Sequence, residues 1–146
     1  MIDQVYNLKI LELAGNITRT GSMDNSDASA EAHSKLCGSK VKVWLKISDG
    51  VVSDFAHEVK ACALGQAASS IMAEHVVGAS LQELKDIRQQ TSDMLREGGK
   101  PPEGKFSDIK YLEPIKDYRA RHASTMLTFD AVVMAIEDYE KNVHAA

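Results

Sequence analysis

A change of hydrophobic period in the middle of the chain constrains its fold more than any other sequence feature. From Val41 to Ile47, apolar residues alternate with polar ones, which is typical of a strand with one buried face. Ser48-Asp49-Gly50 predicts a tight turn, because Asp-Gly accommodates the backbone angles of two-residue hairpin loops. A second alternating segment runs from residue 51 to about residue 61. The sequence therefore predicts an antiparallel hairpin with one face exposed to water.

The remaining segments predict helices around this hairpin. An isolated hairpin is marginally stable, so a strand over residues 28–35 is expected to complete a three-stranded sheet. Apolar periodicity and capping residues predict helices over the ranges 3–14 with Asp3 as N-cap, 64–77, 80–97 and 117–142, with a short helical turn at 107–113 that Pro114 breaks. We therefore expect an α+β fold, a small antiparallel three-stranded sheet packed against several α-helices, with residues 1–146 as a single domain and a long C-terminal helix.

Length and charge exclude several classes of function. The 146 residues are enough to bury a core without disulfides or metals. The formal net charge of −4 gives no electrostatic footprint for nucleic acid or for an anionic membrane surface. No apolar run approaches the ~20 residues that a membrane span requires. The N-terminal residues lack a signal-peptide pattern, so we expect a cytoplasmic location with no nucleic-acid or membrane partner.

Two cysteines are candidates for a chemical role. Cys37 precedes the first strand of the hairpin and Cys62 follows the second, so an antiparallel hairpin brings both to the same end of the sheet. A structural disulfide is disfavoured in a reducing compartment. Cys62 also precedes a predicted helix, whose dipole favours a thiolate at its N-terminus. The alternative is that both cysteines are small buried hydrophobic residues.

Histidines do not complete a metal site by spacing alone. Two thiolates leave a tetrahedral zinc site short of ligands, since zinc takes four, or three plus water or substrate. His57 falls on the core-facing side of its strand, and we expect it to be a core or edge histidine. His122 lies near the start of the last predicted helix, next to Arg119 and Arg121.

Three segments together carry a family resemblance. They are LCGSKVKVWLKISDGVVSDF, VKACALGQAASSIMAEHVVG and ARHASTMLTFDAVVMAIEDY. In order and spacing they resemble the U-type iron–sulfur cluster scaffolds, namely IscU, SufU and the N-terminal domain of NifU. Residues 85–105 resemble the additional segment of the SufU branch, so the chain is SufU-like in length.

The resemblance implies an iron–sulfur cluster assembly scaffold or sulfur acceptor rather than an enzyme, with a sulfurtransferase-like accessory role as an option. Such a protein takes sulfur from a cysteine desulfurase onto Cys62 or Cys37. It holds iron, zinc or a nascent cluster on these two residues and passes the cluster to apo iron–sulfur proteins. The resemblance implies a transient 2Fe–2S cluster or zinc as the bound species, or none in the isolated protein.

Two positions depart from the family pattern. Ser39 stands where the family has the aspartate of Cys-Gly-Asp, and Ser124 stands where it has a third cysteine. A neutral hydroxyl is a poor ligand for soft-metal chemistry. His122, two residues before Ser124, is a candidate source of a nitrogen ligand.

These departures leave a second interpretation of the chain's function open. The chain could be a divergent protein of the scaffold fold that binds or regulates a partner without building clusters. The sequence alone leaves open whether Ser39 and Ser124 are natural or engineered, and what the oligomeric state is.

Overall fold

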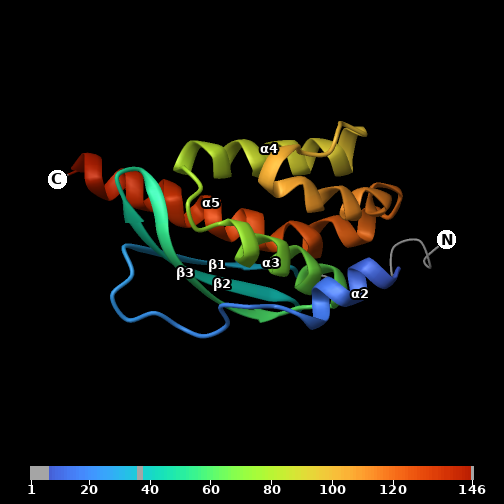
Figure 1. The fold of residues 1–146 in the computed structure, drawn as a ribbon, viewed down its shortest axis with the longest axis horizontal. Helices are drawn as coiled ribbons and strands as arrows, with labels where there is room; N and C mark the ends of the chain where they lie inside the picture. Colours follow the sequence, from blue (N-terminus) through green and yellow to red (C-terminus); the bar gives the residue numbers. More distant parts are fainter. Residues whose placement is uncertain (1–6, 36–37, 146) are drawn as a thin grey trace.

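The computed structural model describes residues 7–35 and 38–145 (Figure 1). Cys37 and the predicted N-cap Asp3 therefore lie outside the described residues. Along the chain the elements are α2 (Leu8–Gly15), β1 (Ala28–His33), β2 (Lys40–Ser48), β3 (Val51–Lys60), α3 (Ala63–His75), α4 (Leu81–Glu97), the 3₁₀ helices η1 (Gly104–Asp117) and η2 (Arg119–Arg121), and α5 (His122–Ala145).

The predicted antiparallel sheet is confirmed. Its strands lie in the order β1-β2-β3, and Lys40 of β2 pairs with Lys60 of β3. Asp49 and Gly50 connect the hairpin with φ angles of 55° and 74°. Both angles are in the left-handed region that a two-residue hairpin turn requires, so the Asp-Gly pair sets the register of β2 against β3.

Helices cover one face of the sheet in two layers. In Figure 1, α3 and α5 run alongside the sheet, and α4 lies on their outer side. The contacts agree, because α5 packs on β1 and β2, α3 packs on β3, and α4 and η1 pack on these helices. The alternating residues Val41, Val43 and Leu45 of β2 are fully buried in this core. The predicted α+β architecture with a long C-terminal helix is therefore confirmed.

Three element boundaries differ from the predictions. Within the described residues, α2 begins at Leu8, and the side chain of Asn7 caps it by accepting a hydrogen bond from the Ile10 N–H at 3.0 Å. Pro114 does not break the chain's helical path but lies inside η1. The last α-helix begins at His122 rather than near residue 117, because η2 precedes it. These 3₁₀ segments follow a threefold repeat, so a search for the 3.6-residue period misses them.

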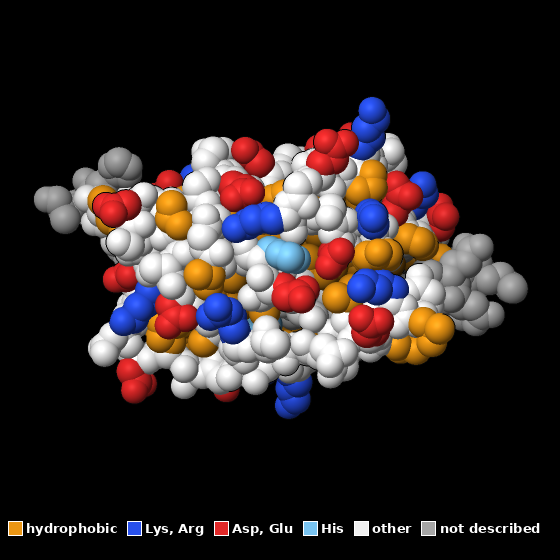
Figure 2. All heavy atoms as spheres, in the orientation of Figure 1, with side chains coloured by type: hydrophobic (Ala, Val, Ile, Leu, Met, Phe, Trp, Pro, Cys, Tyr) orange, Lys and Arg blue, Asp and Glu red, His pale blue; other side chains and the backbone are white. Residues whose placement is uncertain are grey.

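The surface is mixed in charge. Figure 2 shows Lys and Arg interspersed with Asp and Glu over the face seen in Figure 1, with apolar side chains between them. Within residues 7–35 and 38–145, every helix is too short or too polar to cross a bilayer.

His57 is the buried histidine that the strand pattern predicts. Its side chain on β3 is 0% exposed, and its Nε2–H donates to the Thr18 carbonyl at 2.8 Å. Its backbone accepts from the Gly21 N–H at 2.9 Å and donates to the Arg19 carbonyl at 3.1 Å. Its Nδ1 has no hydrogen-bond partner among the described residues. His57 therefore ties the segment after α2 to the sheet.

This burial predicts a pH dependence of stability. Desolvation lowers the pKa of His57 from its usual value of 6.5, and the bond to the Thr18 carbonyl offsets only part of the effect. Below about pH 6.5 the imidazole of residue 57 binds a proton in the unfolded chain, whereas in the folded chain it stays neutral to lower pH. The free energy of unfolding should therefore fall as the pH drops from about 7.5 to about 5, as measured by urea denaturation.

Two variants isolate the contribution of His57. His57→Phe should show a shallower loss of stability over the same pH range, since phenylalanine does not titrate. Ser53→Ala, at an exposed position on the same strand, should keep the wild-type slope, because neither serine nor alanine titrates. Equal slopes for wild type and His57→Phe would show that His57 does not set this dependence.

Candidate functional site

Cys62 lies at the junction of β3 and α3. Its backbone is extended, with φ −67° and ψ 174°, and it is the N-cap of α3. Its carbonyl accepts the first helical hydrogen bond, from the Gln66 N–H at 2.9 Å, while its side chain makes no capping bond. The thiol is partly exposed and is not in a disulfide. It therefore lies at the N-terminal end of α3, next to the first turn of the helix.

Ser124 on the first turn of α5 contacts this thiol. The Cys62 Sγ lies 3.7 Å from the Ser124 Oγ. The Ser124 hydroxyl donates to the Arg121 carbonyl at 3.2 Å, and only 3% of the residue is exposed. The structure thus brings together two residues 62 positions apart in the sequence. The position at which the resemblance places a third cysteine is adjacent to Cys62.

Gly65 allows this approach of α3 to α5. A Cβ at this position would lie 2.7 Å from the Ala61 Cβ and 3.1 Å from the Ser124 carbonyl oxygen. Both distances are shorter than ordinary van der Waals contact, so a side chain would collide with Ala61 just before α3 and would crowd the α5 backbone at Ser124. The next buried residues of α3 are also small, namely Ala67, Ala68, Ser69 and Ser70. The small-residue pattern of this helix therefore holds the thiol against α5.

Ser39 lies at the same end of the hairpin. It immediately precedes β2, and the pairing of Lys40 with Lys60 places it beside the end of β3 that leads to Cys62. Ser39 is 4% exposed, and its carbonyl accepts from the Ser34 N–H at 2.8 Å. The hairpin argument is thus correct for the described residues, whereas the placement of Cys37 lies outside them.

His122 is on a different face of α5 from Ser124. Its Nε2 lies 3.0 Å from the Ile115 carbonyl oxygen and 3.1 Å from that of Lys116. Residues two apart on an α-helix do not share a face. His122 instead lines a groove between β1, α4 and α5, and Cys62 is not among the residues that line it. The structure therefore does not bring this candidate nitrogen ligand to the Cys62–Ser124 pair.

A second group of metal-ligating side chains was missed by the sequence reasoning. Ligand atoms of Glu74, His75 and Asp108 lie within 4.8 Å of one another. Glu74 and His75 belong to the last turn of α3, at the opposite end of that helix from Cys62. Asp108 comes from η1, and no sequence spacing predicted that η1 packs there. This group carries no role in the site around Cys62.

The fold and the thiol together define a class of small α+β proteins. In this chain a cysteine lies between a three-stranded antiparallel sheet and a helix of small residues. The chain belongs to the family of NifU-like N-terminal domains, whose sequence profile matches residues 5–146.

Individual relatives agree with this assignment. The chain is 29% identical over 133 residues to the iron–sulfur cluster assembly scaffold protein IscU of Thermotoga maritima, covering 91% of this chain and 93% of that protein. It is 20% identical over 139 residues to the zinc-dependent sulfurtransferase SufU of Bacillus subtilis, covering 95% and 94%. The predicted family is therefore confirmed.

Solved structures match closely as well. A nitrogen-fixing NifU-like protein (N-terminal) from Brucella abortus superposes with a TM-score of 0.94 at 59% identity, covering 96% of this chain and 97% of the other. A SUF-system scaffold protein from Fervidobacterium islandicum superposes with a TM-score of 0.84 at 21% identity, covering 92% and 98%. The second likeness supports the fold alone.

Proposed function

We propose that the chain is an iron–sulfur cluster assembly scaffold or sulfur acceptor, and that Cys62 is the residue that accepts sulfur. The observation that carries this proposal is the partly exposed thiol at the N-terminus of α3, in contact with Ser124 of α5. The names of the Thermotoga and Bacillus relatives, a cluster assembly scaffold and a sulfurtransferase, support the same role.

The transfer is a thiol exchange. The Cys62 thiolate attacks the outer sulfur of a persulfide on a cysteine desulfurase. A new sulfur–sulfur bond forms on Cys62 as the sulfur–sulfur bond on the donor breaks, and the donor cysteine leaves as a thiolate. The outer sulfur and its proton move to Cys62, so no external oxidant or reductant is needed.

Metal is cargo in this scheme, and the side chains available as ligands favour weak binding of the metal. Cys62 and Cys37 supply the thiolates for iron, zinc or a nascent 2Fe–2S cluster. The Ser124 hydroxyl lies beside Cys62 but is a poor ligand for a soft metal site. Ser39 is close in the fold and is also a weak donor. His122 would first have to leave the Ile115 and Lys116 carbonyls. Weak holding suits a carrier that delivers its cargo to apo iron–sulfur proteins.

A second candidate function has one observation in its favour. The Ser124 hydroxyl is buried and bonded to the Arg121 carbonyl, which is the behaviour of a structural residue rather than of a ligand. In this case the chain binds or regulates an assembly partner without accepting sulfur or metal. Its binding of a desulfurase would then be unchanged when both cysteines are replaced.

The two candidates separate in one experiment. The wild-type chain, Cys37→Ser, Cys62→Ser and the double variant are purified without oxygen and without chelator. Zinc, iron and sulfide content are measured first. Each protein is then incubated with a cysteine desulfurase and cysteine, and intact-mass spectrometry detects added sulfur. We expect one added sulfur or about one metal ion on the wild type, and loss of both in Cys62→Ser.

Ser53→Ala serves as a matched control, because Ser53 is exposed on β3 outside the site. This variant should behave as the wild type. Equal sulfur and metal on the wild type and the double cysteine variant would overturn the proposal. Absence of both from all of these proteins, with desulfurase binding intact, would favour the regulatory candidate.

A further inference from the structure

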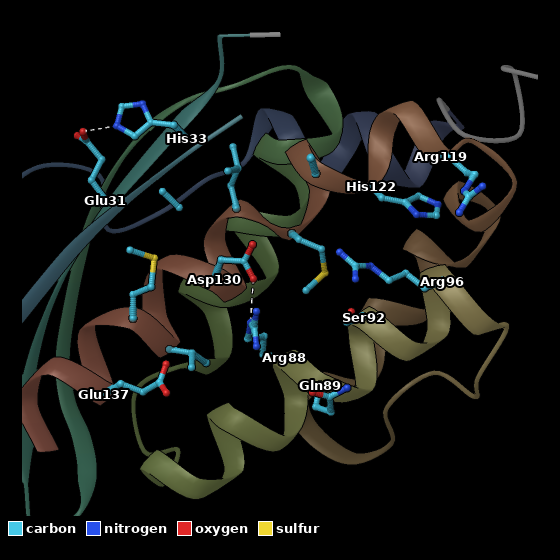
Figure 3. A pocket seen from close by; sticks show the side chains of 16 residues that line it. Glu31, His33, Arg88, Gln89, Ser92, Arg96, Arg119, His122, Asp130 and Glu137 are labelled. Atoms are coloured by element: carbon cyan, nitrogen blue, oxygen red, sulfur yellow. Dashed lines mark hydrogen bonds and ion pairs between the residues drawn. The ribbon is translucent and has the colours of Figure 1, made fainter. Parts of the chain in front are cut away.

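A second surface feature lies apart from the thiol site. A groove of about 940 Å³ runs between β1 and α4 with α5 as its floor, and we call it the β1–α4 groove (Figure 3). Glu31 to His33 form one wall, Arg88 to Arg96 of α4 form the other, and residues 122–137 of α5 form the floor. Cys62, Ser39 and Ser124 do not line it. The groove is therefore a separate candidate for binding.

The floor of the β1–α4 groove combines apolar side chains with the polar side chains of His122, Asp130 and Glu137. Ala123, Met126, Leu127, Val133 and Met134 of α5 line it. Met134 is 47% exposed, although most large apolar side chains of this protein are buried. Methionine is unbranched and polarizable, so it adapts to different apolar partners. Met126, Leu127 and Val133 are at most 7% exposed, so Met134 and Ala123 are the apolar side chains of the floor that a partner can contact.

One end of the groove is positively charged. Figure 3 shows Arg119 and His122 side by side at this end, with Arg96 extending from α4 toward the groove. Among the described residues neither arginine forms an ion pair, and both are exposed. The N-terminus of the 24-residue helix α5 lies at His122 and adds its positive dipole end. This concentration contrasts with the net charge of −4 of the whole chain.

The remaining charges of the groove are balanced or negative. The Arg88 Nε bonds the Asp130 Oδ1 at 2.8 Å, so these two side chains neutralise each other across the groove. The Glu31 carboxylate bonds the His33 Nε2 at 2.7 Å. Glu137 is exposed and lies away from the arginine end in Figure 3. A polyanion covering the full length of the groove would therefore meet Glu137, whereas a segment with carboxylates at one end would not.

We propose that the β1–α4 groove docks an acidic peptide segment of a partner protein that also carries apolar side chains. Its carboxylates bond Arg96 and Arg119, because the guanidinium fork matches a carboxylate in geometry. Its apolar side chains lie on Met134 and Ala123 of α5. A small inorganic anion would leave these two side chains uncovered, and nucleic acid has no apolar side chains to cover them. The inference goes beyond the proposed function, since it requires neither Cys37 nor Cys62.

Three synthetic peptides test the two halves of the proposal. They are fluorescently labelled octapeptides in which four Glu residues are followed by four Leu, four Glu by four Ser, and four Lys by four Leu. Fluorescence anisotropy with the full chain measures their affinities. We expect the Glu-Leu peptide to bind at least about tenfold more tightly than either of the others. Its affinity should also fall as salt is raised, because exposed charges are screened.

Variants of the chain locate the binding. The double variant Arg96→Glu/Arg119→Glu and the single variant Met134→Asp should each weaken the Glu-Leu peptide at least about tenfold. Lys46→Glu, on the solvent-facing side of β2, changes the net charge without touching the groove and should bind as the wild type. Circular dichroism confirms that each variant is folded, and all four residues are exposed or partly exposed.

Several results would overturn the proposal. Equal binding of the Glu-Ser peptide would mean that the groove takes simple anions. Equal binding of the Lys-Leu peptide, or unchanged binding by the double arginine variant, would remove the charge argument. Self-association of the wild type that Met134→Asp abolishes, measured by sedimentation, would mean that a second copy occupies the floor. The groove variants should still accept sulfur on Cys62, so failure here leaves the proposed function standing, and the reverse also holds.

Discussion

Ser124→Cys is expected to raise the zinc affinity of the chain by at least about tenfold, because it replaces a neutral hydroxyl with a thiolate ligand. The position is already correct for a ligand. The Ser124 Oγ lies 3.7 Å from the Cys62 Sγ. Two sulfurs bound to one tetrahedral zinc, each at about 2.3 Å from the metal, are separated by roughly 3.8 Å. The backbone of α5 therefore needs little movement to place a second sulfur beside the Cys62 sulfur.

Competition with a zinc-binding dye measures this effect. The assay is run under reductant, so that a disulfide between the two cysteines does not form. Ser124→Ala is the matched control, since it removes the hydroxyl without adding a ligand, and it should bind zinc no more tightly than the wild type. If Ser124→Cys binds zinc no better than Ser124→Ala, the Cys62–Ser124 pair does not have the geometry of a metal site.

Gly65→Val should destabilise the fold by about 2–3 kcal/mol and move Cys62 away from Ser124. A Cβ at this position would lie 2.7 Å from the Ala61 Cβ and 3.1 Å from the Ser124 carbonyl. Overpacking of this kind typically costs about 1–3 kcal/mol, and valine adds two methyl groups to the clash. Relieving the contact with the Ser124 carbonyl requires α5 to move away from α3, so Cys62 and Ser124 should lose their contact.

Urea unfolding at neutral pH measures the change in the free energy of unfolding. Gly15→Val is the control, because Gly15 ends α2 in open space, with no atom of another residue within 4 Å of an added Cβ. This control should stay within about 1 kcal/mol of the wild type, because the helix propensities of glycine and valine differ by less than about 1 kcal/mol. Equal effects of the two substitutions would refute the close packing of α3 on α5 as the reason for glycine at residue 65.

The sheet and its neighbouring site were predictable because their determinants are local. Alternation over β2 and the Asp49-Gly50 turn define a hairpin without reference to the rest of the chain. An antiparallel hairpin then brings the residue before β2 and the residue after β3 to one end, so the placement of Ser39 near Cys62 follows from topology. Contact of Ser124 with Cys62 required the family resemblance, because 62 residues separate them.

The features that were not predicted depend on tertiary packing. Pro114 suggested a break, but a 3₁₀ helix accommodates it in η1, and η1 then carries Asp108 to the end of α3. The β1–α4 groove draws its walls from two elements more than 50 residues apart, and no local pattern joins Glu31 to Arg88. His122 shares the last helix with Ser124, yet the helical rotation between them directs the two side chains to different surroundings.

The continuity of α5 links two parts of the molecule mechanically. The helix runs without a break from His122 to Ala145, with Ser124 on its first turn and Met134 about 15 Å further along its axis. A tilt of the whole helix that widened the space above Met134 would therefore also turn Ser124 relative to Cys62. Met134 on the outer surface and Ser124 beside the Cys62 thiol thus belong to one continuous helix. A change in the position of this helix at the groove would also change the surroundings of the thiol.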